Sequence, residues 1–104
     1  KFSNDFFMNK NGMLDKFVAM WEKVVMFFLP ETNIIGYDII NEPPEPAFTK
    51  VRISSSGQYE QQQVFIALYK KVSRAIRKID QTKLLFFEPS VADVLGGFYD
   101  SPSE

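Results

Sequence analysis

The chain has 104 residues, of which 45% are hydrophobic and 15% aromatic, and its formal net charge is −1. This composition suits one small domain with an apolar core, and the charge provides no broad attraction to nucleic acid or to an anionic membrane. Cysteine and histidine are absent, which excludes disulfides, thiolate metal sites and any Ser–His or Cys–His catalytic pair carried within the chain.

The first half of the chain predicts a loop, a helix and a strand, in that order. Residues 1–12 are polar and aromatic with Asn and Gly, a pattern typical of a loop that leads to a helix cap near Asn11. Apolar residues then recur at spacings of three and four, which predicts an amphipathic helix over residues 13–28 with Trp21 in its core. Pro30 should end this helix. The β-branched apolar run at residues 34–40 predicts a buried strand.

The second half repeats the order of helix and strand. Residues 41–57 predict a long loop, in which Ser55 and Gln58 could form a capping box. A second amphipathic helix is expected over residues 58–79, with its charged residues on a solvated outer face, and an apolar run predicts a second strand over residues 84–88. Two strands joined through a helix must be parallel, because the connection has to cross over. Two helices cover such a sheet poorly, so the pattern indicates a slice of a (β/α)8 barrel.

The most informative segment begins at Gly36, where an apolar strand runs directly into Asn41-Glu42-Pro43. An amide and a carboxyl group therefore stand at the carboxyl end of a parallel strand, which is where barrel enzymes carry their chemistry. Strand alternation divides the segment into two faces, with the first set expected to face the barrel interior. These sets are Gly36, Asp38, Ile40 and Glu42 on one face, and Tyr37, Ile39 and Asn41 on the other.

A carboxyl group at this position suits glycosidic bond cleavage. That reaction needs a proton donor for the leaving oxygen and a second carboxylate, roughly 5 to 5.5 Å away when configuration is retained. Shielding from water and neighbouring carboxylates disfavour the ionised form of a carboxyl group, as a general acid requires. We therefore predict Glu42 as the general acid and Asn41 as a ligand of the sugar hydroxyl next to the reacting carbon. Pro43 would fix the backbone after the acid.

The motif resembles the glycoside hydrolase family 5 barrel enzymes of the cellulase-like clan, in which Asn-Glu-Pro closes the fourth strand. The segments at Gly36-Tyr37-Asp38 and Leu85-Phe86-Phe87-Glu88-Pro89, with the helix that carries Trp21, look like the endoglycoceramidase branch. This resemblance covers about residues 6–98. It implies an α/β fold class, a partial (β/α)8 TIM barrel from about helix 3 to strand 5 that is incomplete on its own. Residues 1–104 would then be the central fragment of one catalytic barrel.

The same resemblance implies a retaining β-glycosidase that hydrolyses the O-glycosidic bond between glycan and ceramide in glycosphingolipids, with no cofactor or metal. Glu42 would be the acid/base, while the nucleophilic Glu would lie outside the chain, so the isolated chain is expected to be inactive. The expected partner is a glycolipid or oligosaccharide substrate, with peripheral membrane contact through the lipid as an open option. The implied location is secreted, lysosomal or membrane-associated.

Alternatives remain at three residues and for the function. Glu88 could pair with Glu42 as a nucleophile, although the resemblance favours a site-lining, substrate-binding role. Asp38 is either a structural hydrogen-bonding residue or a partner of Glu42, and Glu42 itself could be a solvated residue at an ordinary strand exit. The alternative functions are a family 5 enzyme for glucan, mannan or steryl glucoside, and an inactive truncated relative that only binds sugar.

Overall fold

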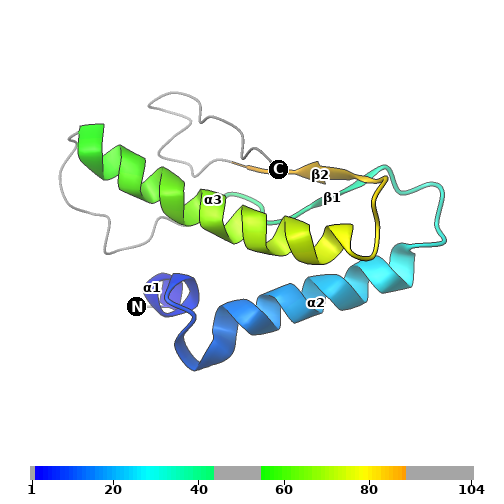
Figure 1. Ribbon diagram of the computed structural model, residues 1–104, viewed down its shortest axis with the longest axis horizontal. Helices are drawn as coiled ribbons and strands as arrows, with labels where there is room; N and C mark the ends of the chain where they lie inside the picture. Colours follow the sequence, from blue (N-terminus) through cyan, green and yellow to red (C-terminus); the bar gives the residue numbers. More distant parts are fainter. Residues whose placement is uncertain (1, 44–54, 89–104) are drawn as a thin grey trace.

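The computed structural model describes residues 2–43 and 55–88 (Figure 1). Over these ranges the chain forms α1 (Phe2–Phe7), a 3-10 turn η1 (Lys10–Gly12), α2 (Met13–Phe28), β1 (Gly36–Asp38), α3 (Ser55–Arg77) and β2 (Leu84–Phe86). The two strands lie side by side, with α3 against them and α2 beyond it in the view of Figure 1. The described part is therefore a small α/β unit in which the helices pack on one face of the sheet.

The amino-terminal segment corrects the sequence-based prediction of a loop over residues 1–12. It contains the short helix α1 followed by η1. The ring of Phe6 packs edge to face on Phe17, and that of Phe7 packs in the same way on Phe65, each at a centroid distance of 5.3 Å. These partners are distant in sequence, so local composition gave no sign that the segment is held as a helix.

Helix α2 has the predicted bounds, and its N-cap position is Gly12, next to Asn11, near which the cap was predicted. Asn9, Asn11 and Gly12 all have positive φ, and this left-handed turn reverses the chain before Met13. The Oδ1 of Asn9 accepts the backbone N–H of Leu14 at 3.0 Å and that of Asp15 at 3.1 Å, which satisfies two donors that the first helical turn leaves unpaired. The donors of the first turn are thus satisfied by the Asn9 side chain, three residues before the N-cap position.

The two strands are parallel, as the crossover argument predicted, with Gly36 opposite Leu84 and Asp38 opposite Phe86. Both are shorter than the predicted ranges of 34–40 and 84–88. The ladder ends with the Leu84 N–H donating to the Ile35 carbonyl at 2.9 Å and the Ile39 N–H donating to the Phe86 carbonyl at 3.3 Å. Apolar runs show which residues can be buried, whereas strand length depends on how far two backbones stay paired.

Helix α3 starts earlier than the predicted range of 58–79, at Ser55, and it also ends earlier, at Arg77. Residues 55–57, which were predicted in the loop, belong to the helix. The helix ends at Arg77, since the N–H groups of Ile79 and Asp80 both donate to the Ile76 carbonyl, at 2.9 and 2.8 Å. Residues 44–54 of the predicted loop, and the side chains of the proposed capping box, lie outside the part that the structure describes.

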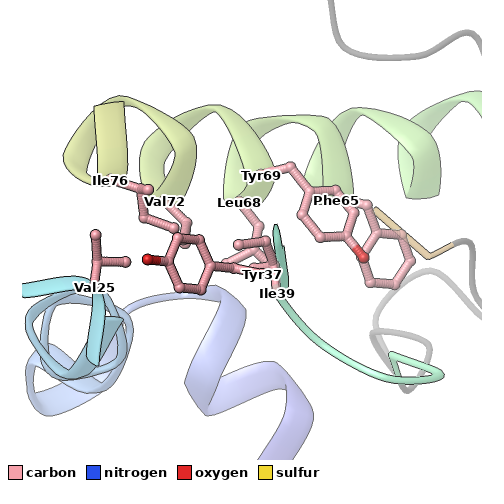
Figure 2. Packing of buried hydrophobic residues seen from close by; sticks show 8 residues of the cluster. All are labelled: Val25, Tyr37, Ile39, Phe65, Leu68, Tyr69, Val72 and Ile76. Atoms are coloured by element: carbon pink, nitrogen blue, oxygen red, sulfur yellow. The ribbon is translucent and has the colours of Figure 1, made fainter. Parts of the chain in front are cut away.

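The core lies between α3, α2 and the helix-facing side of β1. Figure 2 shows side chains from α3 directed toward Tyr37 and Ile39 of the first strand segment. Trp21 packs on Tyr37 at a centroid distance of 6.1 Å, as its predicted core position requires, and its indole N–H meets no acceptor among the described residues. The buried cluster consists of Val25, Tyr37, Ile39, Phe65, Leu68, Tyr69, Val72 and Ile76.

A buried carboxylate, Asp80, joins the elements at the amino ends of the strands. It is 2% exposed and accepts hydrogen bonds from the Tyr37 hydroxyl at 3.2 Å and from the Lys83 ammonium at 3.1 Å. The backbone N–H groups of Thr82 and Lys83 donate to its other oxygen at 2.9 and 3.1 Å. Lys83 also donates to the Leu29 carbonyl at the end of α2, at 3.1 Å. This network links β1, α2 and the turn before β2.

Candidate functional site

The candidate site lies at the carboxyl ends of the two strands. Asp38 is the last residue of β1, Asn41 and Glu42 follow it, and Glu88 follows β2. Tyr37 and Ile39 are buried against the helices while Asp38 is exposed, so the predicted alternation holds along the strand. It does not extend to Asn41, which was assigned to the same face as Tyr37 and Ile39 but is exposed. The strand has already ended at Asp38, and the pleat that sets the alternation ends with it.

Glu42 and Glu88 are brought together by the pairing of their strands. The backbone N–H of Glu42 donates to Oε2 of Glu88 at 2.7 Å. Glu42 has a φ of 43°, a left-handed conformation that non-glycine residues adopt uncommonly. Its side chain is exposed, while Pro43 after it is fully buried. The residue predicted as general acid therefore stands at a sharp backbone bend whose N–H is held by a carboxylate from the neighbouring strand.

Glu88 is itself fixed by the helix that covers the sheet. The hydroxyl of Tyr69 in α3 donates to the Glu88 carbonyl at 2.6 Å, and the Tyr69 ring packs edge to face on Phe87 at a centroid distance of 4.8 Å. In the sequence, Tyr69 is one of the apolar positions whose spacing predicts the second helix. Its position on the buried face gave no indication that its hydroxyl would reach the end of a strand.

Asp38 ends the strand beside that of Glu88, and Glu88 affects its ionisation. Partial burial raises the pKa of Asp38 above its usual range, and the neighbouring Glu88 raises it further. The only signal in the sequence was that both residues end adjacent parallel strands, which placed them at one edge.

The outer surface between the two long helices carries a separate feature. A groove of about 600 Å³ is lined by residues of α2, of α3 and of the turn after α3, and its walls include four of the charged residues that were predicted on the solvated helix face. Lys71 also pairs with Asp15 of α2. Because neither strand contributes to this groove, it lies apart from the carboxyl groups at the strand ends. The four cations are Lys70, Lys71, Arg74 and Lys78.

Two further observations concern the described ranges, residues 2–43 and 55–88. Within them no three acidic side chains come together closely enough to hold a metal ion. The helices of these ranges also include none that combines the length and the apolar composition needed to cross a bilayer.

Comparison with known proteins identifies the family. The sequence profile of Cellulase (glycosyl hydrolase family 5) matches residues 2–94. The chain belongs to glycosyl hydrolase family 5. This confirms the resemblance drawn from Asn41-Glu42-Pro43, and the small α/β unit with parallel strands is consistent with part of a family 5 barrel domain. Family membership implies a carbohydrate substrate.

Curated proteins match most of the length of this chain. It is 29% identical to an endoglycoceramidase of Cyanea nozakii over 81% of its own length and 17% of the relative's. It is 31% identical to an endoglycoceramidase of Hydra vulgaris over 90% of its length and 18% of the relative's. A β-xylosidase of Phanerodontia chrysosporium is 29% identical over 79% of the chain and 14% of that protein. No solved structure gives a significant match.

These relatives limit what the comparison establishes about the substrate. The chain spans less than a fifth of each of them, at 17%, 18% and 14% of their lengths. Their names also differ in substrate, two being endoglycoceramidases and one a β-xylosidase. The family is therefore established, whereas the glycoside that is cleaved is a matter for proposal.

Proposed function

We propose that this chain supplies the acid/base side of a retaining β-glycosidase site, with Glu42 as the general acid/base. The observation that supports this most directly is the position of Glu42, exposed at the carboxyl end of β1 and held there by Glu88 from the neighbouring strand. In a (β/α)8 barrel that edge carries the active site. In this proposal α2 is the third barrel helix, and β1 and β2 are the fourth and fifth strands.

The proposed reaction proceeds in two steps. In the first, a nucleophilic carboxylate from outside this chain attacks the anomeric carbon, while Glu42 gives its proton to the leaving oxygen and an alcohol departs. In the second, Glu42 takes a proton from water, the water oxygen attacks the same carbon, and the carboxylate is released. Asn41, which is exposed beside Glu42, would bind the sugar hydroxyl next to that carbon.

Glu88 fits a site-lining role better than that of the nucleophile. Its Oε2 accepts the Glu42 backbone N–H at 2.7 Å, and its negative charge raises the pKa of Asp38. A nucleophile has to face the acid across the sugar ring, about 5 to 5.5 Å from it. A carboxylate has about four lone-pair positions, so Glu88 can keep these contacts and still accept a hydrogen bond from the substrate. We propose this substrate-binding role for it.

For the substrate we propose a glycosphingolipid cleaved between glycan and ceramide. Two relatives named endoglycoceramidase support this, one of them matching over 90% of the chain. The second candidate is another β-glycoside, favoured by the relative named β-xylosidase. The two differ in the leaving group, which is a long lipid alcohol in the first case and a sugar or other small alcohol in the second.

The experiment extends the transcript in both directions from this coding region and expresses the complete reading frame. Hydrolysis of a fluorescent glycosphingolipid is compared with that of a xyloside, and Glu42→Gln is expected to lower kcat/KM by about 10²- to 10⁴-fold, because the leaving oxygen loses its proton donor. Glu31→Gln, at an exposed glutamate in the turn after α2, is the matched control and should retain activity.

Two outcomes would contradict the proposal. One is a Glu42→Gln enzyme as active as the unchanged protein, which would remove Glu42 from the chemistry. The other is glycan release by residues 1–104 alone, because the proposed nucleophile lies outside this chain.

A further inference from the structure

Two chain segments continue past the end of the paired strands and carry the candidate site between them. The ladder ends with the bond from the Ile39 N–H to the Phe86 carbonyl, at 3.3 Å. Glu42 lies three residues beyond Ile39, and Glu88 lies two beyond Phe86. The segments meet again where the Glu42 N–H donates to Oε2 of Glu88 at 2.7 Å. Because the sheet pairing has ended there, the positions of these two residues depend on side-chain contacts.

Glu42 needs such a contact because of its backbone conformation. Its φ of 43° is a left-handed conformation that a non-glycine residue keeps only when the surrounding structure holds it. The group that holds its N–H is the side chain of Glu88. How firmly Glu42 is placed therefore depends on how firmly the neighbouring strand end is placed.

Tyr69 of α3 fixes that neighbouring strand end. Its side chain extends from the helix into the core (Figure 2) and is 3% exposed. The hydroxyl donates to the Glu88 carbonyl at 2.6 Å, and the ring packs edge to face on Phe87 at a centroid distance of 4.8 Å. These contacts with two consecutive residues fix the backbone from which the Glu88 side chain extends.

The hydroxyl of Tyr69 is the part of this side chain that core packing does not require. A phenylalanine ring would bury nearly the same apolar area and keep the contact with Phe87. A buried hydroxyl is costly unless it is hydrogen-bonded, and this one is bonded to the residue that holds Glu42. The contacts thus lead from the buried core to the exposed candidate acid, in the order Tyr69, Glu88, Glu42.

We propose that Tyr69 is a positioning residue, which fixes the backbone of Glu88 so that the Glu88 side chain holds the Glu42 N–H. Through this residue the covering helix α3 sets the place of the general acid at the strand end. Tyr69 acts through Glu88 and takes no part in the proton transfer. The catalytic consequence rests on the proposed acid/base role of Glu42, whereas the coupling of Tyr69 to the Glu42 backbone does not.

Hydrogen exchange followed by mass spectrometry tests this coupling in the protein encoded by the complete reading frame. Pro43 and Pro44 have no amide hydrogen, so a short proteolytic peptide that ends at Pro44 reports on Asn41 and Glu42. Tyr69→Phe keeps the ring and removes the hydroxyl. It is expected to accelerate exchange in this peptide by about 2- to 10-fold, which corresponds to the loss of one hydrogen bond. Unchanged exchange would overturn the inference.

Tyr37→Phe is the matched control, since it also removes a buried tyrosine hydroxyl from the core. The Tyr37 hydroxyl donates to Asp80 at 3.2 Å, at the opposite end of the strands. This variant should lower the urea midpoint, as Tyr69→Phe should, but leave exchange at Asn41 and Glu42 unchanged. Equal acceleration in both variants would overturn the inference, because it would show a general loosening of the core.

A double-mutant cycle on kcat tests whether Tyr69 acts through Glu88. Tyr69→Phe should lower kcat by about 2- to 10-fold with little change in KM. This effect should persist in Glu88→Gln, which keeps an oxygen for the Glu42 N–H, and disappear in Glu88→Leu, which does not. An effect of the same size in Glu88→Leu would overturn the inference. The expected exchange results without hydrolysis of any glycoside would instead overturn only the proposed function.

Discussion

The two ends of the strand pair hold their carboxylates in opposite ways. At the amino end, Asp80 is 2% exposed and is surrounded by hydrogen-bond donors. At the carboxyl end, the Glu42 backbone N–H donates to Oε2 of Glu88, and the side chains of Asp38 and Glu42 are exposed. The difference teaches that one edge of this sheet buries its carboxylate among hydrogen-bond donors, while the other leaves two of its carboxyl groups exposed. In parallel barrels the latter edge is where chemistry is placed.

The pKa values of the two ends shift in opposite directions for physical reasons that can be named. Burial alone would raise the pKa of Asp80, but hydrogen bonds from the backbone of Thr82 and Lys83 and from their side chains outweigh it and hold the pKa well below its usual range. At Asp38, partial burial raises the pKa, and the neighbouring Glu88 raises it further. Hydrogen-bond donors thus stabilise the ionised form of Asp80, whereas the neighbouring Glu88 disfavours the ionised form of Asp38.

The largest expected effect is at the amino end. Asp80→Ala should lower the free energy of unfolding by about 3 to 5 kcal/mol, because it leaves the largely buried Lys83 ammonium without its counter-charge. Urea unfolding followed by circular dichroism measures the change. Glu31→Ala, at an exposed carboxylate, is the control and should cost less than about 0.5 kcal/mol. A loss below about 1 kcal/mol for Asp80→Ala, which is the usual contribution of one neutral hydrogen bond, would contradict this prediction.

A smaller loss is expected where the strands approach each other most closely. A Cβ atom added at Gly36 would lie 2.5 Å from the Leu84 carbonyl oxygen and 2.7 Å from the Phe86 ring. Gly36→Ala should therefore cost about 1 to 3 kcal/mol through forced movement of a paired backbone. Gly12→Ala is the comparison, because a Cβ there meets nothing within 4 Å and any cost comes from its φ of +68°. Equal urea midpoints for Gly36→Ala and the unchanged chain would contradict this prediction. They would mean that the two strands move apart to admit the Cβ atom without a loss of stability.

The opposite pKa shifts predict opposite dependences of stability on pH. Asp80, with its lowered pKa, contributes stability that is present above the unfolded value of about 3.9 and is lost as the pH falls below it. Asp38, with its raised pKa, contributes stability that is present below that value and is lost as the pH rises through the folded pKa. Asp38→Asn should therefore stabilise the chain at pH 7 and lose this advantage below about pH 4.

The measurement is the urea midpoint of each variant at pH 7 and at pH 3.5. Asp80→Asn should be less stable than the unchanged chain at pH 7, with the difference shrinking in acid. The gain for Asp38→Asn should be smaller than this loss, since Asp38 is exposed and solvent screens its neighbours. A stabilising effect of Asp38→Asn that persists unchanged at pH 3.5 would argue against a charge-based origin.

The smallest effect is expected on the outer helix face. Lys71→Ala removes the ion pair with Asp15 between α3 and α2, in which both side chains are well exposed. Such surface pairs contribute about 0 to 1 kcal/mol, so the urea midpoint should hardly change and any loss should vanish in high salt. A salt-independent loss would indicate that the aliphatic part of the Lys71 side chain stabilises the fold by packing in the groove between α2 and α3, and that its charge does not contribute.

The sequence by itself determined the order of helix, strand, helix and strand, the parallel pairing, the bounds of α2 and the family. Each of these follows from information carried by neighbouring residues, namely apolar spacing, Pro30, the need for a crossover and the run Asn41-Glu42-Pro43. The functional roles of Glu42, Asn41 and Glu88 remain predictions from the same run.

Only the tertiary structure decided which distant residues meet. Helix α1 is held by the packing of Phe6 on Phe17 and of Phe7 on Phe65. Asp80 can be buried because hydrogen-bond donors from separate elements surround it. The hydrogen bond from the Glu42 N–H to Glu88 likewise forms where two strand ends come together in space. Local pattern fixes what each segment prefers, whereas these contacts depend on the register and packing of segments far apart in the chain.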